Sequence, residues 1–150
     1  MKSDDLAQWM RQEHDRVEDL AGVLLKEVAA PPRTQVQEWL THLRDRFDHM
    51  RAHLQKHMAL EEQDGYLPSV VEQRPTLFDQ VERLKHEHGE ITRIMDGIHT
   101  ALHEAGPDDR MLVRECCQRI ENVLTEVQRH EADENLMVMS AFTRDIGANG

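Results

Sequence analysis

The sequence predicts an all-α fold, an antiparallel up-down-up-down four-helix bundle, from three observations. The chain has 150 residues, a length that suits a single domain. Its seven glycines and five prolines are few, so long helices can continue without interruption. Four segments between these breaks carry apolar residues at alternating steps of three and four, which is typical of bundle helices. We therefore expect residues 1–150 to form one helical domain.

Proline and glycine residues divide the chain into four predicted helices and a C-terminal tail. The predicted helices are 4–29, 33–63, 76–105 and 109–143, and the tail is 144–150. The three breaks between the helices are Pro31-Pro32, Gly65 to Pro75, and Gly106-Pro107. An aspartate directly after the last break is well placed to cap the fourth helix. Because the connections are short, consecutive helices should be antiparallel neighbours.

Each predicted helix has one stripe of residues that should face the core. In the first helix the stripe is Met10, His14, Val17, Ala21, Leu24 and Val28. In the second it is Leu40, Leu43, Phe47, Met50, Leu54, His57 and Glu61. In the third it is Val81, Leu84, His88, Ile91, Met95, Ile98 and Leu102. In the fourth it is Val113, Cys116, Ile120, Val123, Val127, His130, Glu134, Met137 and Ala141.

Histidine and glutamate interrupt these otherwise apolar stripes, and antiparallel packing brings all the interruptions to one end of the bundle. They are His14, His57, Glu61, His88, His130 and Glu134. Burying an ionised carboxylate without a partner costs several kcal/mol, and two carboxylates in one layer repel each other. A pair of metal cations removes both problems. We therefore predict that these six residues are metal ligands.

The types and spacing of the predicted ligands restrict the metal. Imidazole with carboxylate suits iron, manganese or zinc, and nitrogen ligands disfavour calcium and magnesium. The pairs His57–Glu61 and His130–Glu134 are spaced i,i+4, so both members lie on one helix face. Ferritin-like di-iron proteins use Glu-x-x-His instead, so this chain predicts a different arrangement of ligands.

The remaining histidines lie off the stripes. They are His42, His49, His53, His86, His99 and His103. His53 precedes His57 by one turn and is close enough to be an outer partner of the site. His99 and His103 form an i,i+4 pair, but they flank the stripe near the opposite end of the bundle. We interpret this group as solvated or boundary residues.

These residues together resemble the hemerythrin and HHE cation-binding family over nearly the whole chain. The strings Glu13-His14-Asp15 and His130-Glu131 also look like that family. The resemblance implies two non-haem iron ions, bridged by Glu61, Glu134 and an oxo or hydroxo group. It further implies that His14 and His57 bind one iron, and that His88 and His130 bind the other.

The chain departs from the oxygen-carrying hemerythrins at two places. They have a second histidine four residues from His88, where this sequence has Leu84 and Thr92. They also place an aspartate one residue after the position of Glu134. The iron bound by His88 and His130 should therefore have an additional open position. Some hemerythrin-like domains recruit an extra carboxylate, and Glu18 or Glu62 is near enough to be considered.

The resemblance with these departures implies a di-iron protein that binds or senses dioxygen or a related small ligand, such as peroxide or nitric oxide. Reversible oxygen carriage is not the default expectation. Two alternatives stay open: a di-iron enzyme that acts on peroxide or oxygen, and an iron-handling or iron-sensing interaction module.

The composition excludes other classes of partner. The formal net charge is −11 without a basic patch, which argues against nucleic acid. No segment approaches the roughly 18 to 20 apolar residues that span a membrane, and the first residues lack a signal-peptide core. We therefore expect a cytoplasmic protein. The adjacent Cys116 and Cys117 form no CxxC motif, and Cys116 should be a small buried apolar residue. A homodimer is compatible with the sequence, but no unused stripe requires one.

Overall fold

The computed structural model describes residues 3–63 and 66–148 and confirms the all-α prediction. Its elements are α1 (Ser3–Ala29), α2 (Val36–Gln63), α3 (Tyr66–Gln73), the 3-10 helix η1 (Pro75–Leu77), α4 (Phe78–Glu104) and α5 (Arg110–Ala148). No helix in the described ranges has both the length and the apolar character needed to cross a membrane.

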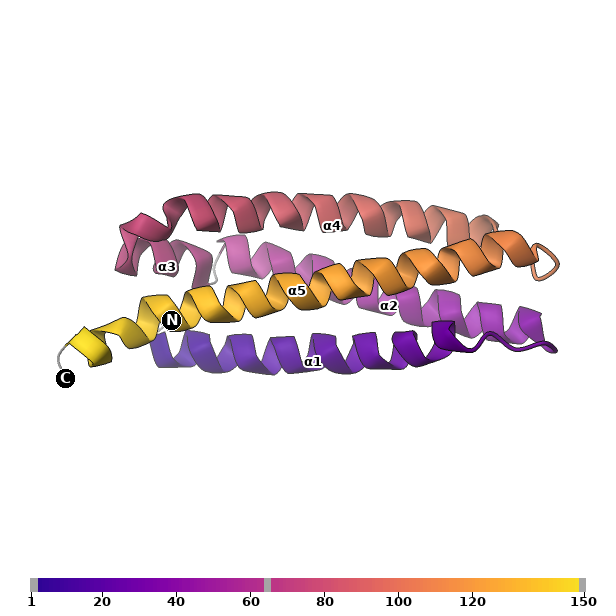
Figure 1. The fold of residues 1–150 in the computed structure, drawn as a ribbon, viewed down its shortest axis with the longest axis horizontal. Coiled ribbons are helices and arrows are strands. Elements are labelled where there is room, and N and C mark those ends of the chain that lie inside the picture. Colours follow the sequence, from indigo (N-terminus) through magenta and orange to yellow (C-terminus); the bar gives the residue numbers. More distant parts are fainter. Residues whose placement is uncertain (1–2, 64–65, 149–150) are drawn as a thin grey trace.

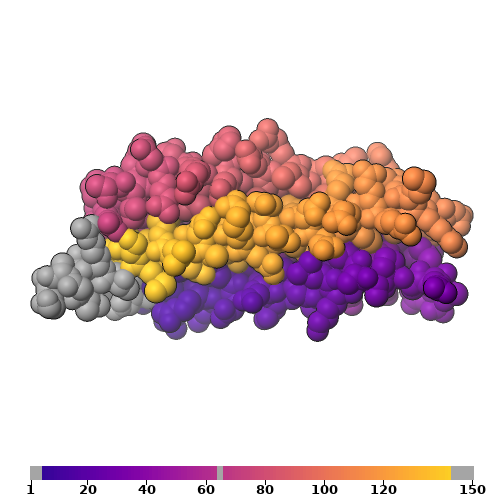
Figure 2. All heavy atoms as spheres, viewed as in Figure 1, coloured from indigo at the N-terminus to yellow at the C-terminus, as the bar shows by residue number. Residues whose placement is uncertain are grey.

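Four long helices lie side by side and form the bundle (Figure 1). Each contacts two neighbours, so that α1, α2, α4 and α5 follow one another around a closed ring. Both chain ends and α3 lie at one end of the bundle, and the α1–α2 and α4–α5 connections lie at the other. Figure 2 shows the elongated outline, with α5 between α4 and α1. The structure therefore has the antiparallel four-helix arrangement that the short connections predict.

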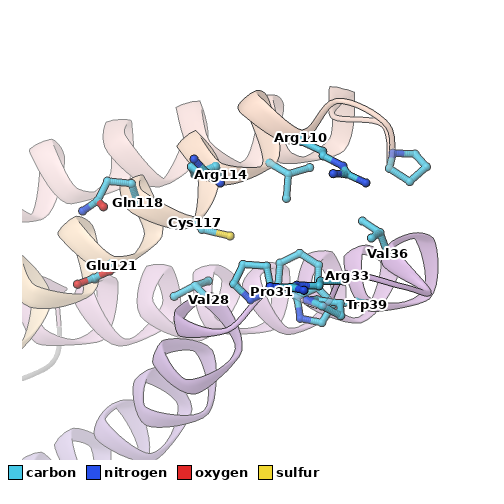
Figure 3. Close-up of a pocket in the computed structure, with 13 residues that line it drawn as sticks. Val28, Pro31, Arg33, Val36, Trp39, Arg110, Arg114, Cys117, Gln118 and Glu121 are labelled. Atoms are coloured by element: carbon cyan, nitrogen blue, oxygen red, sulfur yellow. The ribbon is translucent and has the colours of Figure 1, made fainter.

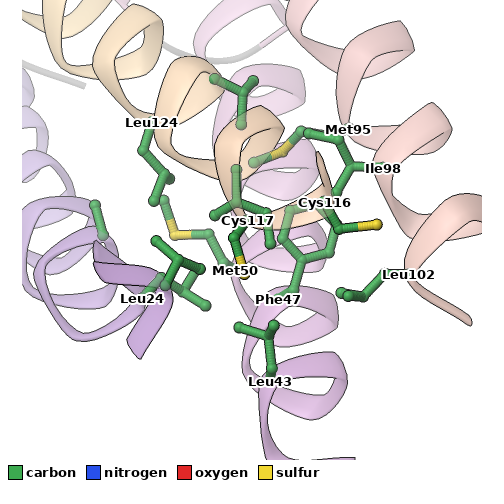
Figure 4. Packing of buried hydrophobic residues seen from close by; sticks show 14 of the residues in the cluster. Leu24, Leu43, Phe47, Met50, Met95, Ile98, Leu102, Cys116, Cys117 and Leu124 are labelled. Atoms are coloured by element: carbon green, nitrogen blue, oxygen red, sulfur yellow. The ribbon is translucent and has the colours of Figure 1, made fainter. Parts of the chain in front are cut away.

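Every residue of the four predicted stripes is buried, so the helical periodicity identified the core correctly. The larger of two apolar clusters fills the half of the bundle that is remote from α3. Figure 4 shows its packing around Phe47 and Met50 of α2, with Leu24 from α1 and Met95 from α4. Cys116 is fully buried in this cluster, as predicted.

The segment from Gly65 to Pro75 differs from the prediction, because it contains the short helix α3. Pro68 is the third residue of α3, within the first turn, where a missing backbone N–H costs little. Tyr66 and Leu67 are fully buried there, in a second apolar cluster that also includes Leu6 and Met10 of α1. A proline that appeared to mark only a break is therefore compatible with a helix that covers the end of the core.

Two helix boundaries differ from the prediction by three or more residues. The second helix begins at Val36, not at 33, and Gln35 before it has a φ of 56°, which is incompatible with a right-handed helix. The last helix ends at Ala148, so most of the predicted tail 144–150 is helical. No glycine or proline precedes Gly147 in that segment, so nothing local ends the helix earlier. Residues 149–150 of the tail lie outside the described residues.

Candidate metal centre

A layer of buried polar side chains separates the two apolar clusters of the core. On α1, His14 lies between Met10 of the α3-side cluster and Val17 of the larger cluster. The helices α4 and α5 change from one cluster to the other in the same way, whereas the buried apolar residues of α2 all belong to the larger cluster. The layer consists of the residues predicted as ligands: His14, His57, Glu61, His88, His130 and Glu134, all buried. The structure therefore brings all six together.

The Nε2 atoms of the four histidines converge on the carboxylates of Glu61 and Glu134. His88 Nε2 lies 3.4 Å from Glu61 Oε2 and 3.3 Å from Glu134 Oε1. His14 Nε2 lies 3.8 Å from Glu134 Oε2. His57 Nε2 contacts Glu61 Oε1, and His130 Nε2 contacts Glu134 Oε1.

These donor atoms form two overlapping groups, each compact enough for one metal ion. One group is His14, His57, Glu61 and Glu134, and the other is Glu61, His88, His130 and Glu134. Within each group the donor atoms lie within 4.8 Å of one another. Both carboxylates belong to both groups. The arrangement is suited to hold metal, and Glu61 and Glu134 are the residues that the two groups share.

The opposite nitrogen of each histidine faces an oxygen from the next helix in the ring. Three Nδ1 atoms make hydrogen bonds: His14 to Asn135 Oδ1 at 2.8 Å, His88 to Glu62 Oε2 at 3.2 Å, and His130 to Glu87 Oε1 at 2.8 Å. The fourth, His57 Nδ1, lies 3.6 Å from Glu13 Oε2. A carboxylate only accepts, so Nδ1 of His88 and Nδ1 of His130 carry the proton in their hydrogen bonds. This tautomer leaves the Nε2 lone pair free to bind a metal.

The two central carboxylates have opposite pKa shifts. Burial raises the pKa of Glu134 well above its ordinary value, and the neighbouring charge of Glu61 raises it further. Burial acts in the same direction on Glu61, but the close imidazoles of His57 and His88 outweigh it and lower the pKa of Glu61. Two carboxylates this close cannot both ionise unless positive charge lies between them. A bound cation would supply that charge.

Several buried polar atoms of the layer have no hydrogen-bond partner within the described part of the chain. They are Nε2 of His14, His57 and His130, Nδ1 of His57, both carboxylate oxygens of Glu61, and Oε2 of Glu134. An unsatisfied buried polar atom costs about 1–3 kcal/mol, so a set of this size needs an explanation. The unsatisfied Nε2 and carboxylate atoms are the ones that point to the centre. A pair of metal ions fits this donor set.

Comparison with known proteins agrees with this geometry. The family model of the hemerythrin HHE cation binding domain matches residues 5–144. The chain belongs to the hemerythrin HHE family. No curated protein and no solved structure shows a significant match to it. The family resemblance noted from the sequence is therefore confirmed over nearly the whole chain, and the buried histidine and glutamate groups of this hemerythrin domain are suited to hold metal.

The positions at which this hemerythrin domain departs from the oxygen carriers hold no further ligand. Leu84 is packed in the α3-side cluster, and the Thr92 hydroxyl donates to the backbone carbonyl of His88 at 2.8 Å. Glu18 is exposed, and Glu62 contacts the outer nitrogen of His88. Among the described residues, neither of these glutamates belongs to the two metal-binding groups.

Sequence reasoning missed one buried carboxyl group, and it missed three of the four residues that contact the Nδ1 atoms of the layer histidines. Glu131 is only 8% exposed, and its Oε1 has no hydrogen-bond partner among the described residues. Burial, followed by the charges of Glu61, Glu18 and Glu13, raises the pKa of Glu131 to about 9. Glu131 lies one residue off the predicted stripe. It is buried because the buried face of α5 is wider than a strict a/d seam.

The four residues that contact the Nδ1 atoms could have been found from the sequence, because each is adjacent in the chain to a predicted ligand. Glu13 precedes His14, Glu62 follows Glu61, Glu87 precedes His88 and Asn135 follows Glu134. Each serves a histidine of a neighbouring helix.

Replacing Glu87 by alanine should weaken metal binding without removing a ligand. Loss of a carboxylate that orients a ligating histidine typically costs about 10- to 100-fold in metal affinity, so we expect a decrease of that size. Competition with a chromophoric chelator would measure it. The matched control is Glu82→Ala, which changes an exposed glutamate of the same helix that pairs with Lys85. Equal affinities of the two variants would contradict an orienting role for Glu87.

Two cavities differ in their relation to the polar layer. A cavity of about 690 Å³ lies at the end of the bundle remote from α3, between Trp39, Arg33 and Arg114 (Figure 3). It touches none of the six layer residues. A second cavity of about 430 Å³ lies between α1 and α5 and is lined by His14 and Asn135. Most of its other lining is apolar, including Met10, Val138 and Phe142. Of these two cavities, only the second is lined by a residue of the polar layer.

Proposed function

We propose that this hemerythrin domain is a non-haem di-iron protein that binds or senses dioxygen or a related small ligand, such as peroxide or nitric oxide. The observation that carries the proposal is the pair of overlapping donor groups that share two carboxylates. His14 and His57 would hold one iron, His88 and His130 the other, and Glu61 and Glu134 would bridge them with an oxo or hydroxo group. Bound iron would supply the redox chemistry and the coordination position that a small ligand needs.

Each iron would receive four protein donors, two imidazoles and two shared carboxylates. Iron sites with fewer protein donors than the metal's coordination number retain positions for exogenous ligands. The sequence predicted an additional open position at the His88 and His130 iron. In the structure both groups have the same number and kind of donors, so the count of ligands does not favour either metal. Access of the small ligand to each metal then decides which metal it binds.

The cavity beside His14 supports entry of a small ligand on the α1–α5 side. Its lining is mainly apolar, and His14 lies at its wall. Small apolar molecules such as dioxygen and nitric oxide partition into apolar cavities more readily than ions do. We therefore propose that such a ligand reaches the centre past Met10 and Val138.

Metal analysis with an optical spectrum tests the iron proposal. We expect about two irons per chain, because the six residues form two complete groups, and near-ultraviolet absorption typical of an oxo bridge in the aerobic protein. Reduction and exposure to nitric oxide or dioxygen should change the spectrum. A protein that contains no iron, and whose stability a chelator leaves unchanged, would refute the proposal. Sustained turnover of added peroxide would favour the enzyme alternative over simple binding.

The entry route can be tested separately with one variant and its control. Ala7→Phe should fill part of the cavity and slow nitric oxide binding to the reduced protein, while the iron content stays the same. Ala132→Phe adds the same side chain at an exposed position of α5 and should not slow binding. An unchanged rate in Ala7→Phe would show that ligands enter by another path.

A further inference from the structure

A third cluster of metal-binding side chains lies on the surface, between α2 and α4. His99 and His103 are one turn apart on α4, and their ring centroids are 4.4 Å apart. Asp48 of α2 contacts both: His99 Nδ1 donates to Asp48 Oδ1 at 2.6 Å, and His103 Nε2 donates to Asp48 Oδ2 at 2.8 Å. The donor atoms of the three residues lie within 4.8 Å of one another.

We propose that Asp48, His99 and His103 form a second metal site, which binds one divalent first-row transition cation such as Zn²⁺ and links α2 to α4. Two imidazole nitrogens and one carboxylate oxygen are a recurrent ligand set for such cations, with water in the remaining positions. The nitrogen donors disfavour calcium and magnesium.

The surface cluster is separate from the buried centre. His99 and His103 follow His88 by 11 and 15 residues, which corresponds to about 16 and 22 Å along a helix at 1.5 Å per residue. The buried residues Ile91, Met95 and Ile98 lie along α4 in between. The side chains of Asp48, His99 and His103 are 35%, 35% and 42% exposed, so a cation can reach them directly from solvent.

The charges around Asp48 leave its carboxylate available to a cation. Two arginines of α2 lie one turn away from it on either side, but each has other partners. Arg44 donates to the backbone carbonyls of Leu102 and Ala105 at the end of α4. Arg51 pairs with Asp96 through Nη2 at 2.7 Å. Neither arginine makes an ion pair with Asp48, whose carboxylate oxygens face the two imidazoles.

The observed separations need little change to accept a metal ion. With metal–ligand bonds of about 2.0–2.2 Å in tetrahedral geometry, neighbouring donor atoms lie roughly 3.3 Å apart. The present nitrogen–oxygen distances of 2.6 and 2.8 Å are shorter than this by about 0.5–0.7 Å. Rotation of exposed side chains can supply that difference without a movement of the helices. Each imidazole would transfer its proton to the other ring nitrogen or release it, and would bind through the nitrogen that now faces Asp48.

Zinc titration of the purified protein, with its core metal in place, tests the proposal. We expect one Zn²⁺ equivalent to bind with micromolar affinity, and affinity to fall at least about tenfold in His99→Ala, His103→Ala and Asp48→Asn. Co²⁺ should give visible absorption at the same site. The matched control is His86→Ala, which removes an exposed histidine of α4 that pairs with Glu90. Iron content should be equal in all variants.

The outcomes separate this site from the buried centre. Loss of one zinc equivalent in the three variants, with His86→Ala unaffected, supports the surface site whatever metal the core holds. Zinc binding that persists unchanged in His99→Ala and His103→Ala would overturn the proposal, as would no binding below millimolar zinc. A loss of core iron in these variants would also contradict it, because it would show that the two sites are not independent.

Discussion

Replacing Glu61 by alanine is expected to remove both metal ions from the buried centre. Glu61 belongs to both donor groups, so its loss leaves each metal position one ligand short. Removing an outer partner alone typically costs about 10- to 100-fold in affinity, and the loss of a bridging ligand should cost more, so metal content should fall from about two per chain to below roughly 0.2. Elemental analysis of the purified variant would measure it.

The sequence offers a matched control for this prediction. His86 and Glu90 have the same i,i+4 spacing as His57 and Glu61, but they lie on the exposed face of α4 with 2.9 Å between His86 Nε2 and Glu90 Oε1. Glu90→Ala should therefore keep its full metal content. His57→Ala should also lose metal sharply, although His57 belongs to only one of the two groups. Full metal content in Glu61→Ala would refute the assignment of the bridging carboxylates.

Metal removal is expected to lower the unfolding temperature by about 8–16 °C. A ligand that binds only the folded state at about 1,000 times its Kd stabilises the protein by about 4 kcal/mol. For a chain of this size, 1 kcal/mol corresponds to about 2–4 °C in Tm. The centre contains two buried carboxylates with unsatisfied oxygens, so the folded apoprotein retains the cost of their burial.

Thermal unfolding followed by circular dichroism, before and after treatment with reductant and chelator, would measure this shift. The Glu61→Ala variant provides the internal control, because a protein that holds no metal should not respond to the chelator. If the chelator shifted the Tm of this variant as much as that of the parent, the stabilisation would come from another metal site. The surface cluster of Asp48, His99 and His103 would then be the place to test.

The sequence predicted the core and the polar layer well because both depend on local periodicity. Whether a side chain such as His57 or Glu134 faces the core follows from the 3.6-residue repeat of its own helix, whichever helices lie next to it. The position of a residue along the bundle axis follows from the antiparallel order of the helices. Six side chains on four helices could therefore be placed in one layer from sequence alone.

Contacts between helices could not be predicted in the same way. The periodicity of one helix does not predict which neighbouring helix packs against each side of its buried stripe. Asp48 and His99 are 51 residues apart and meet only because α2 and α4 are adjacent in the ring. The pair of His130 with Glu87 depends likewise on α4 and α5 being neighbours. The helix α3 was missed for another reason: Pro68 is disfavoured within a helix but tolerated in its first turn.

The outer partners of the four histidines have a consequence for assembly of the bundle. Glu13 joins α1 to α2, Glu62 joins α2 to α4, Glu87 joins α4 to α5, and Asn135 joins α5 back to α1. These four contacts form a closed belt around the bundle at one level. A helix that slipped by one turn, about 5.4 Å, would break its contacts with both neighbours at once. The belt thus opposes a shift of any one helix along the bundle axis, through contacts that do not involve the nitrogens predicted to bind metal.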